Sequence, residues 1–307
     1  MNILVLQAYG KVEIFYEAAW CLASIWLQDP EIEQDTLVVI ATDNPSFFRE
    51  YTPFLTKIEF ITINELVLND WKGAINFVHR VKIKVLQEVN SRYPNAQLLY
   101  ADTDTIFQVK VSSLFDRIQK GSILMHANEG ALNTSGAAPL NKRIYSRFKN
   151  ASLSINKKQV NFSPDFVMFN AGIIGLPSAL ASIVLEETLS LTDLIYPMLP
   201  KHIMEQLAFS YICQKHATVS DTSSEIDHYW NIKEARPAIK LRLEELKGKD
   251  SLYSAMAFTE KLNELPLGKW SLERIKYRAN PPLMRAFLRW TNKDWKLPLP
   301  LQDFKLD

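Results

Sequence analysis

Two carboxylates one residue apart follow a short apolar run in the first half of the chain. Asp102 and Asp104 come directly after Leu98–Ala101. The run predicts a buried strand, and side chains two residues apart on an extended chain point to the same side. Carboxylates at the end of a buried strand are costly to desolvate unless a positive charge meets them. Two oxygen ligands on one side suit Mg²⁺ or Mn²⁺, which substrate phosphates and water usually complete, so we predict a divalent metal site here.

Three later motifs carry polar side chains that could belong to the same site. Asn170 and Gly172, in the sequence Phe-Asn-Ala-Gly, offer an amide to a hydroxyl-rich ligand and a backbone that permits its close approach. Glu205 and Gln206 place an acid beside an amide on a predicted helix. His228 offers an imidazole, which can complete a metal site begun by two carboxylates. Each motif alone is also compatible with an ordinary structural role, as a strand bulge, a solvated helix face or a packing histidine.

The elements that must position these residues alternate between strands and helices. The hydrophobic pattern predicts strands over Ile3–Leu6, Thr36–Ala41, Lys57–Ile63 and the run before Asp102, with helices over Glu13–Leu27 and Phe77–Val89. This order predicts an α/β fold, with a mostly parallel sheet and helices on both faces. Ligands of such sheets collect beyond the carboxyl ends of the strands, which is where the two aspartates are expected.

The second half of the chain has a less regular pattern. It predicts strands over residues 122–126 and 217–220, a strand over 166–176 that Asn-Ala-Gly interrupts, helices over 178–191 and 202–214, and a flexible loop over 128–139. From about Ile232 the pattern is helical to the end. We therefore expect one domain over residues 1–231 and a C-terminal helical extension over 232–307.

Composition excludes several classes of protein. The chain has 307 residues, 47% hydrophobic and 22% charged, with a net charge of +1, which is typical of a soluble globular protein and gives no general attraction to nucleic acid. Two cysteines in apolar helical patterns argue against a disulfide framework and favour a reducing compartment. With no signal peptide and no run near the ~18 apolar residues of a membrane span, we expect a cytoplasmic protein.

Taken in order, the motifs resemble the metal-dependent glycosyltransferases of the GT-A fold, most closely those like glycosyltransferase family 8. The resemblance consists of Leu-Tyr-Ala-Asp-Thr-Asp, Phe-Asn-Ala-Gly, an acid-Gln pair on a helix and a late histidine, and it ends at about Asn231. It implies that residues 1–231 are a catalytic domain that binds a nucleotide sugar. The reaction it implies is sugar transfer from a nucleotide-diphosphate donor, UDP by resemblance, to a glycan or lipid-linked acceptor, with Mn²⁺ or Mg²⁺ as cofactor.

The resemblance also implies a role for each matching residue on the metal side and in the sugar pocket. Asp102, Asp104 and His228 would hold the metal against the diphosphate, with Asp102 also near sugar or ribose hydroxyls. Asn170 and Gly172 would line the sugar pocket.

Further matches concern the reacting carbon and the nucleotide. Glu205 and Gln206 would contact the donor sugar near the reacting carbon, and together with Asn170 they are the candidate catalytic residues. For donor binding, the remaining candidates are Tyr9 at the base, Asp43 at the base or ribose, and the basic residues Arg80 and Lys84, which share one face of a helix.

The sequence departs from the family pattern at two places. Relatives usually carry Asp before the Gln, where this chain has Glu205, and family 8 members follow the late histidine with Gly and Lys-Pro-Trp, where this chain has Tyr-Trp-Asn. The superfamily is therefore better supported than the family. Resemblance favours retention of configuration, while an inverting enzyme would need a carboxylate base, for which Glu205 and Asp227 are the candidates.

Other functions remain open at the level of the sequence. Asp102-Thr-Asp-Thr also resembles the haloacid-dehalogenase-type phosphatases, in which the first Asp is a nucleophile, but that motif usually opens the chain. A non-catalytic nucleotide-sugar binder would not need Asp102, Asp104 and His228 together. A nucleotidyltransferase would need a Gly-rich basic loop after the first strand, which Gln7–Lys11 does not provide.

The C-terminal extension combines basic and aromatic residues over 269–296. Such a pattern suits a helix lying on anionic lipid, so one hypothesis is peripheral docking at the inner face of the membrane. The alternative, which we favour, is a helical cap that packs its aromatic side chains on the sheet.

Overall fold

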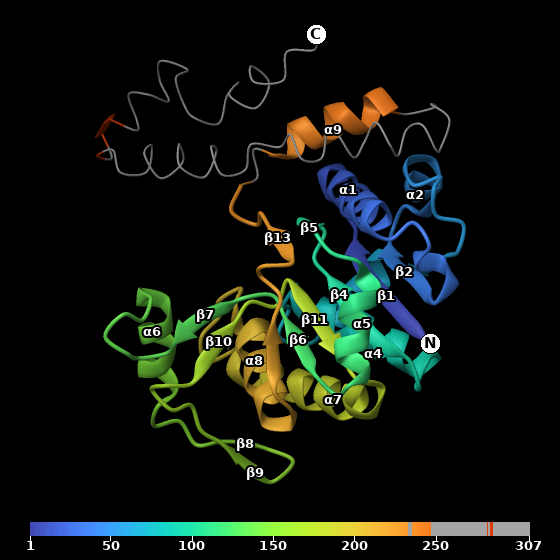
Figure 1. The fold of residues 1–307 in the computed structure, drawn as a ribbon. Helices are drawn as coiled ribbons and strands as arrows, with labels where there is room; N and C mark the ends of the chain where they lie inside the picture. Colours follow the sequence, from blue (N-terminus) through green and yellow to red (C-terminus); the bar gives the residue numbers. More distant parts are fainter. Residues whose placement is uncertain (233–234, 247–280, 282, 285–307) are drawn as a thin grey trace.

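A computed structural model describes residues 1–232, 235–246, 281 and 283–284 (Figure 1). Its centre is a seven-stranded sheet in the order β12-β6-β11-β4-β1-β2-β3. The strands are β1 (Asn2–Ala8), β2 (Thr36–Thr42), β3 (Ile58–Thr62), β4 (Gln97–Ala101), β6 (Ile123–Met125), β11 (Ile173–Leu176) and β12 (Val219–Asp221). Strand β11 runs antiparallel to both neighbours, and the other neighbouring pairs are parallel. The predicted α/β class with a mostly parallel sheet is confirmed.

Helices cover both faces of this sheet (Figure 1). They are α1 (Val12–Gln28), α2 (Pro45–Tyr51), α3 (Glu65–Lys72), α4 (Arg80–Arg92), α5 (Val111–Gln119), α6 (Pro139–Phe148), α7 (Ser178–Ile195), α8 (Met204–His216) and α9 (Ala235–Leu246), with a short 3-10 turn at Ile32–Gln34. Alternate residues of β1 face the two layers, so Leu4 and Leu6 pack with α1 and α5 while Ile3 and Val5 pack with α4 and α8. Burial on both faces explains why the central strands are continuously apolar.

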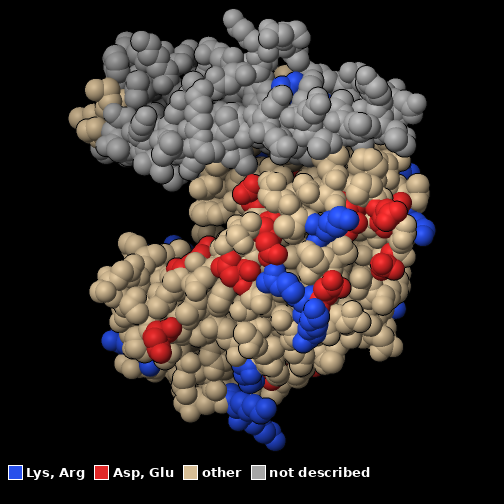
Figure 2. Space-filling model, viewed as in Figure 1, with Lys and Arg blue, Asp and Glu red and all other residues tan. Residues whose placement is uncertain are grey.

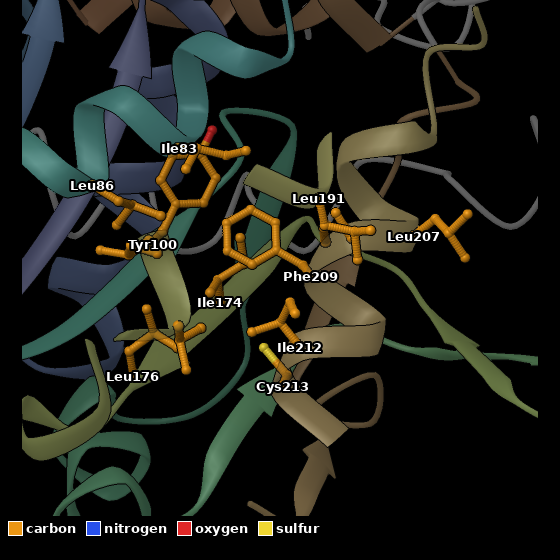
Figure 3. Close-up of a cluster of buried hydrophobic side chains, with 14 of the residues drawn as sticks. Ile83, Leu86, Tyr100, Ile174, Leu176, Leu191, Leu207, Phe209, Ile212 and Cys213 are labelled. Atoms are coloured by element: carbon orange, nitrogen blue, oxygen red, sulfur yellow. The ribbon is translucent and has the colours of Figure 1, made fainter. Parts of the chain in front are cut away.

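The second of these layers forms a dense core between the sheet and helices α4, α7 and α8. Figure 3 shows Phe209 of α8 lying between Ile174 of β11 and Leu191 of α7, with Tyr100 of β4 close by. All four side chains are fully buried. This core fixes the end of β4, and therefore the start of the segment that carries the two aspartates.

Three short antiparallel ladders lie outside the main sheet. They pair β5 (Thr105–Phe107) with β13 (Ile226–His228), β7 (Asn128–Ala131) with β10 (Val167–Phe169), and β8 (Leu153–Ile155) with β9 (Lys158–Val160). The predicted loop over 128–139 thus begins with a strand, because pairing with β10 gives these polar residues an extended partner. The predicted strand over 166–176 is indeed divided, with Asn170–Gly172 joining β10 to β11.

Helix α9 makes up most of the described part of the C-terminal extension, and it packs on α1. The Arg236 guanidinium makes two hydrogen bonds of 2.9 Å to the buried Glu17 carboxylate. Most of the segment 269–296, for which membrane docking was one hypothesis, lies outside the described residues. No helix in the described part of the chain has the length and apolar character needed to cross a membrane. Acidic and basic side chains are interspersed on the face in Figure 2.

Candidate active site

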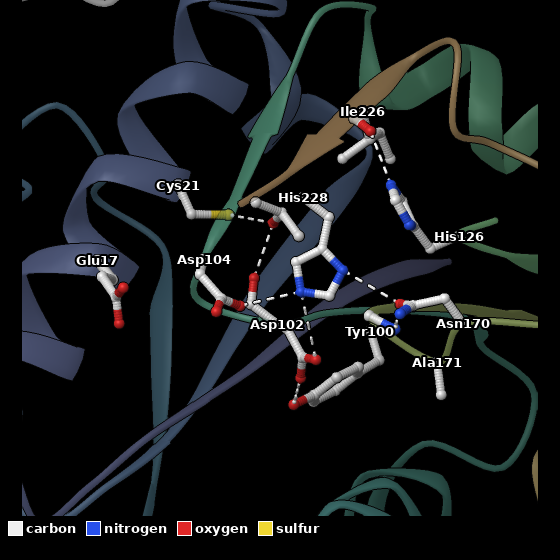
Figure 4. Close-up of polar contacts among 12 residues, drawn as sticks. Glu17, Cys21, Tyr100, Asp102, Asp104, His126, Asn170, Ala171, Ile226 and His228 are labelled. Atoms are coloured by element: carbon white, nitrogen blue, oxygen red, sulfur yellow. Dashed lines mark hydrogen bonds and ion pairs between the residues drawn. The ribbon is translucent and has the colours of Figure 1, made fainter. Parts of the chain in front are cut away.

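The two aspartates lie in a tight turn between β4 and β5, held by backbone contacts on both sides (Figure 4). The Asp102 N–H donates to the Gly172 carbonyl at 2.7 Å, and the Asp102 carbonyl accepts from the Thr105 hydroxyl at 2.7 Å. The Asp104 carbonyl accepts from the Tyr229 N–H at 3.0 Å. The turn lies where β4 ends, at the carboxyl edge of the sheet, as the sequence predicted.

His228 is brought to the aspartates by the pairing of β13 with β5, in which it lies opposite Thr105. Its Nε2 is 3.1 Å from an oxygen of Asp104 and 3.9 Å from an oxygen of Asp102. One ligand atom from each of the three side chains lies within 4.8 Å of the others. The three residues that sequence analysis proposed as metal ligands therefore converge on one point.

The hydrogen bond that Nδ1 of His228 makes tests whether these three side chains fit a metal ion. Asn170 Oδ1 accepts from the Gly172 N–H at 2.8 Å, so the atom facing His228 Nδ1 at 3.1 Å is an oxygen. Only a protonated Nδ1 can make this contact. In the neutral ring, Nε2 then carries a lone pair directed at two carboxylates, an arrangement that a cation between them stabilises. A ligating histidine with its second nitrogen donating in this way is typical of metal sites, and the donor set fits a divalent ion.

Gly172 is required by the approach of this imidazole to the backbone. A Cβ at position 172 would lie 2.3 Å from Cε1 and 2.4 Å from Nδ1 of His228. No side chain fits there unless the ring moves.

A buried cation, Lys82 of α4, lies against the aspartates and was not among the predicted residues. Its Nζ is 3.2 Å from Asp102 and 3.0 Å from Glu205, and it donates to the Ala171 carbonyl at 2.9 Å. Burial lowers the pKa of Lys82, but the two carboxylates outweigh burial and raise it above its ordinary value. The ammonium group therefore stays charged and joins Asp102, one of the three candidate metal ligands, to Glu205.

The basic residues predicted on this helix, Arg80 and Lys84, do not line the cavity that opens beside the two aspartates. Arg80 instead binds Asp193 of α7 at 2.7 Å and the Trp71 carbonyl at 2.7 Å. Residues two positions apart on a helix point about 200° apart, so the face that carries Arg80 and Lys84 is not the face of Lys82. The sequence did hold a signal for Lys82, because it precedes buried Leu86 and Val89 at spacings of four and seven, which puts a charge on the apolar face.

A cavity of about 580 Å³ opens beside these groups. The predicted residues that line it are Asp102, Asp104, Asn170, Gly172, Glu205, Gln206 and His228. Lys82 and Glu129, which the sequence analysis missed, line it as well, and Leu140, Ile203 and Trp230 add apolar surface. The volume and the mixture of apolar walls with a few convergent polar groups are typical of small-molecule sites.

Tyr9 and Asp43, predicted at the base or ribose, lie outside this cavity lining but at the same edge of the sheet. They follow β1 and β2, and the Gly10 N–H donates to Asp43 at 2.9 Å, which joins the two loops. Burial raises the pKa of Tyr9 to about 12, with the charge of Lys82 opposing the shift and that of Asp43 adding to it. Tyr9 is therefore coupled electrostatically to the buried lysine and to Asp43.

No protein-family model and no curated protein sequence matches the chain. Among solved structures it is similar to the galactosyltransferase LgtC in complex with donor and acceptor sugar analogues, with 12% identity, a TM-score of 0.51, and coverage of 86% of this chain and 96% of that one. An active-site mutant of LgtC aligns with 11% identity and a TM-score of 0.50, over 72% of this chain and 73% of that one. The chain has the GT-A fold.

The GT-A fold accounts for how residues distant in the sequence meet here. The parallel strands β1, β2 and β4 end at one edge of the sheet, and the reversed strand β11 begins at that edge. Asn170–Gly172, which enters β11, therefore lies beside the turn that leaves β4. Helix α8, in the layer that α4, α7 and α8 form on one face of the sheet, contributes Glu205 and Gln206, and β13 contributes His228.

Proposed function

We propose that this chain is a metal-dependent glycosyltransferase that moves a sugar from a nucleoside-diphosphate donor, UDP by resemblance, to a hydroxyl group of an acceptor. The observation that carries the proposal is the convergence of Asp102, Asp104 and His228 on the wall of a cavity that also holds a buried cation and two amides. Catalytic metal sites in proteins leave positions open for substrate, and three ligands do so. Mn²⁺ or Mg²⁺ is the expected cofactor.

The leaving group of such a reaction is a nucleoside diphosphate, on whose oxygens negative charge increases as the bond to the sugar breaks. When bound, a divalent cation supplies Lewis-acid stabilisation of that charge. Asp102, Asp104 and His228 hold and orient the cation in this proposal. Lys82 adds a fixed positive charge at 3.2 Å from Asp102, in a site where burial strengthens electrostatic interactions.

The sugar of the donor lies, in this proposal, against Asn170, Glu205 and Gln206. Positive charge develops at the anomeric carbon, which the Gln206 amide oxygen can stabilise. Neither candidate for an inverting base is well placed. Glu205 is ion-paired with Lys82 at 3.0 Å, and Asp227 binds Gln108 at 2.9 Å outside the cavity lining. We therefore extend the proposal to retention of configuration at the anomeric carbon.

The acceptor side of the cavity is marked by Trp230, which is 54% exposed and lines the cavity. It lies in the turn that follows β13, two residues after His228, and both side chains line the cavity. A flat indole face at a cavity mouth suits the apolar face of a sugar ring, so the acceptor we propose is a glycan, free or lipid-linked.

A phosphatase function with Asp102 as nucleophile has less support. One oxygen of Asp102 accepts from the Tyr100 hydroxyl at 2.7 Å and lies 3.2 Å from Lys82, and the other lies 3.4 Å from Lys82. These contacts hold the carboxylate in place and reduce its nucleophilicity.

Thermal stabilisation by UDP, GDP, CMP and ADP, each with and without Mn²⁺, tests the proposal. A ligand at 100 times its dissociation constant adds about 2.7 kcal/mol to the free energy of unfolding. We expect one nucleoside diphosphate, UDP, to stabilise the wild type only with Mn²⁺, and Asp104→Ala to abolish the effect. Asp116→Ala, which removes an exposed carboxylate of α5, is the matched control and should respond like wild type. If no nucleotide stabilises the wild type, the donor site does not exist and the proposal fails.

A further inference from the structure

We propose that Glu129 is a positioning residue that fixes the orientation of the two amides, Asn170 and Gln206, and so sets which atoms they present to the metal ligand and to the sugar. This inference rests on the proposed function, since it names what orients the groups of that site. Glu129 lies in β7, in a polar stretch far from the motifs that the sequence analysis singled out.

The contacts of Glu129 are divided evenly between the two amides. One carboxylate oxygen accepts from Asn170 Nδ2 at 2.9 Å, and the other accepts from Gln206 Nε2 at 2.7 Å. Both amide side chains belong to buried residues, with exposed fractions of 7% and 8%. Water therefore has little access to replace a lost partner, and the orientation of each amide depends on its protein contacts.

A carboxylate accepts hydrogen bonds and does not donate them, so each amide must turn its NH₂ group toward Glu129. For Asn170 this directs Oδ1 to the Gly172 N–H and to His228 Nδ1, at 2.8 and 3.1 Å. The Gly172 N–H enforces the same orientation, so Asn170 is held twice. The carboxylate thus contributes to the His228 tautomer that leaves Nε2 available to a metal.

Gln206 depends on Glu129 more strongly. Within the described part of the chain, the only hydrogen bond of its side chain is the one from Nε2 to Glu129. With the NH₂ group fixed there, the atom of Gln206 left for a ligand in the cavity is its carbonyl oxygen. An oxygen at this place stabilises positive charge at the reacting carbon, whereas a flipped amide would present N–H groups and oppose it.

The backbone around Glu129 is itself held in place. The Asn128 N–H donates to Asp221 at 2.6 Å, and Asn128 Oδ1 accepts from the Gly130 N–H at 2.8 Å. Gly130 has φ of 86°, a conformation that suits glycine, and the β7–β10 ladder changes register at this level. Irregular pairing of this kind directs a side chain away from the usual alternation, here toward the two amides.

The test uses Glu129→Gln, which keeps the shape of the side chain but leaves one acceptor oxygen. The variant side chain has one acceptor oxygen, so it can accept a hydrogen bond from only one of the two amides. Its own NH₂ group then faces the NH₂ group of the other amide, and no hydrogen bond forms between them. Since Asn170 keeps its Gly172 contact, we expect Gln206 to lose its partner. Glu225→Gln is the matched control, because Glu225 is ion-paired with Arg117 and does not line the cavity.

Three measurements separate positioning from other roles: kcat and KM for transfer, kcat for donor hydrolysis without acceptor, and the side-chain amide resonance of Gln206 by ¹⁵N NMR. We expect Glu129→Gln to lower kcat for transfer and for hydrolysis together, by roughly 10- to 100-fold as for other groups that orient ligands. The KM values should change little, and the Gln206 resonance should shift. Glu225→Gln should change none of these.

Two results would overturn the inference. If transfer falls while donor hydrolysis is unchanged, Glu129 acts on the acceptor and not through the amides. If the Gln206 resonance does not move in Glu129→Gln, the carboxylate does not orient that amide. If the wild type transfers no sugar but the resonance shifts in Glu129→Gln alone, the positioning holds and the proposed function fails, so the two failures are distinguishable.

Discussion

Replacement of Lys82 by Met is the sharpest test of how the site is held together. The substitution keeps most of the side-chain length and removes the charge between Asp102 and Glu205. Both ion pairs of Lys82 are lost, and the Glu205 carboxylate, which is only 3% exposed, loses a cation at 3.0 Å. Asp102 is more exposed and retains the Tyr100 hydroxyl at 2.7 Å. The loss in the free energy of unfolding should therefore come mainly from the unpaired Glu205 carboxylate.

The magnitude follows from the distance and the burial. Two unit charges at 3.0 Å interact by about 5.5 kcal/mol at an effective dielectric constant near 20. Desolvation offsets part of that attraction, but removing one partner leaves the other charge buried, and such substitutions cost about 3–5 kcal/mol. We expect Lys82→Met to lower the free energy of unfolding by that amount, whereas exposed ion pairs contribute at most about 1 kcal/mol.

Urea unfolding followed by tryptophan fluorescence, without ligand, measures the effect. Lys84→Met on the same helix is the matched control and should change the free energy of unfolding by less than about 0.5 kcal/mol. Adding Glu205→Gln to Lys82→Met removes the unpaired charge and should restore part of the loss. A cost below about 1 kcal/mol for Lys82→Met, or a double variant no more stable than the single one, would refute the reasoning.

Three further predictions concern the metal, an acid-sensitive ion pair and the acceptor. Gly172→Ala should weaken Mn²⁺ binding at least about tenfold in a calorimetric titration, because the new Cβ displaces His228. Gly136→Ala, whose new Cβ meets open space, is the control and should bind Mn²⁺ like wild type. Equal affinities of the two variants for Mn²⁺ would contradict this. Burial raises the pKa of Glu187, but hydrogen bonds from the lysine and histidine of α8 outweigh burial and lower it below 4.5. Glu187→Gln should therefore destabilise the protein at pH 7, and its difference from wild type in urea unfolding should shrink as the pH falls below about 4.5; a difference independent of pH would count against this. Trp230→Ala should raise the acceptor KM at least about fivefold with donor hydrolysis unchanged, whereas a parallel loss of hydrolysis would place Trp230 on the donor side.

The central fold was predictable because its strands are buried on both faces. The continuous apolar runs of β1, β2 and β4 have few other interpretations, and the helix before β4 shows apolar residues at a spacing of four, from Phe77 to Val89. The strands β5, β7 and β13 were not predicted, because each is three or four residues long and exists by pairing with a strand far away in the sequence. Local pattern carries no information about such partners.

Site residues could be predicted where residue type and strand position gave the same indication. Asp102, Asp104 and His228 have side chains whose chemistry suggests a metal, and the structure brings them together. Lys82 was overlooked because Arg80 and Lys84 form a more obvious basic face. Glu129 was overlooked because its neighbours Asn and Gly indicate a loop. What the sequence lacks in both cases is the direction of a side chain, which only the packed fold determines.

The pairing of β7 with β10 has a consequence for how the ligand preference of the cavity could change. The chain leaves β7 after Ala131 and returns to β10 at Val167. The paired strands form a stem, which ends with a hydrogen bond from the Leu132 N–H to the Phe166 carbonyl at 2.9 Å. Between these ends lie α6 and the β8–β9 hairpin, and the excursion contributes Leu140 to the mouth of the cavity. It contains no metal ligand and no contact of the buried lysine. Asn141 of α6 is the exception that a graft would have to keep, because its amide donates to the carbonyls of Glu129 at 3.4 Å and Ala131 at 3.3 Å. With Asn141 retained, a graft between related chains could replace one wall of the cavity without touching Asp102, Asp104, His228 or Lys82.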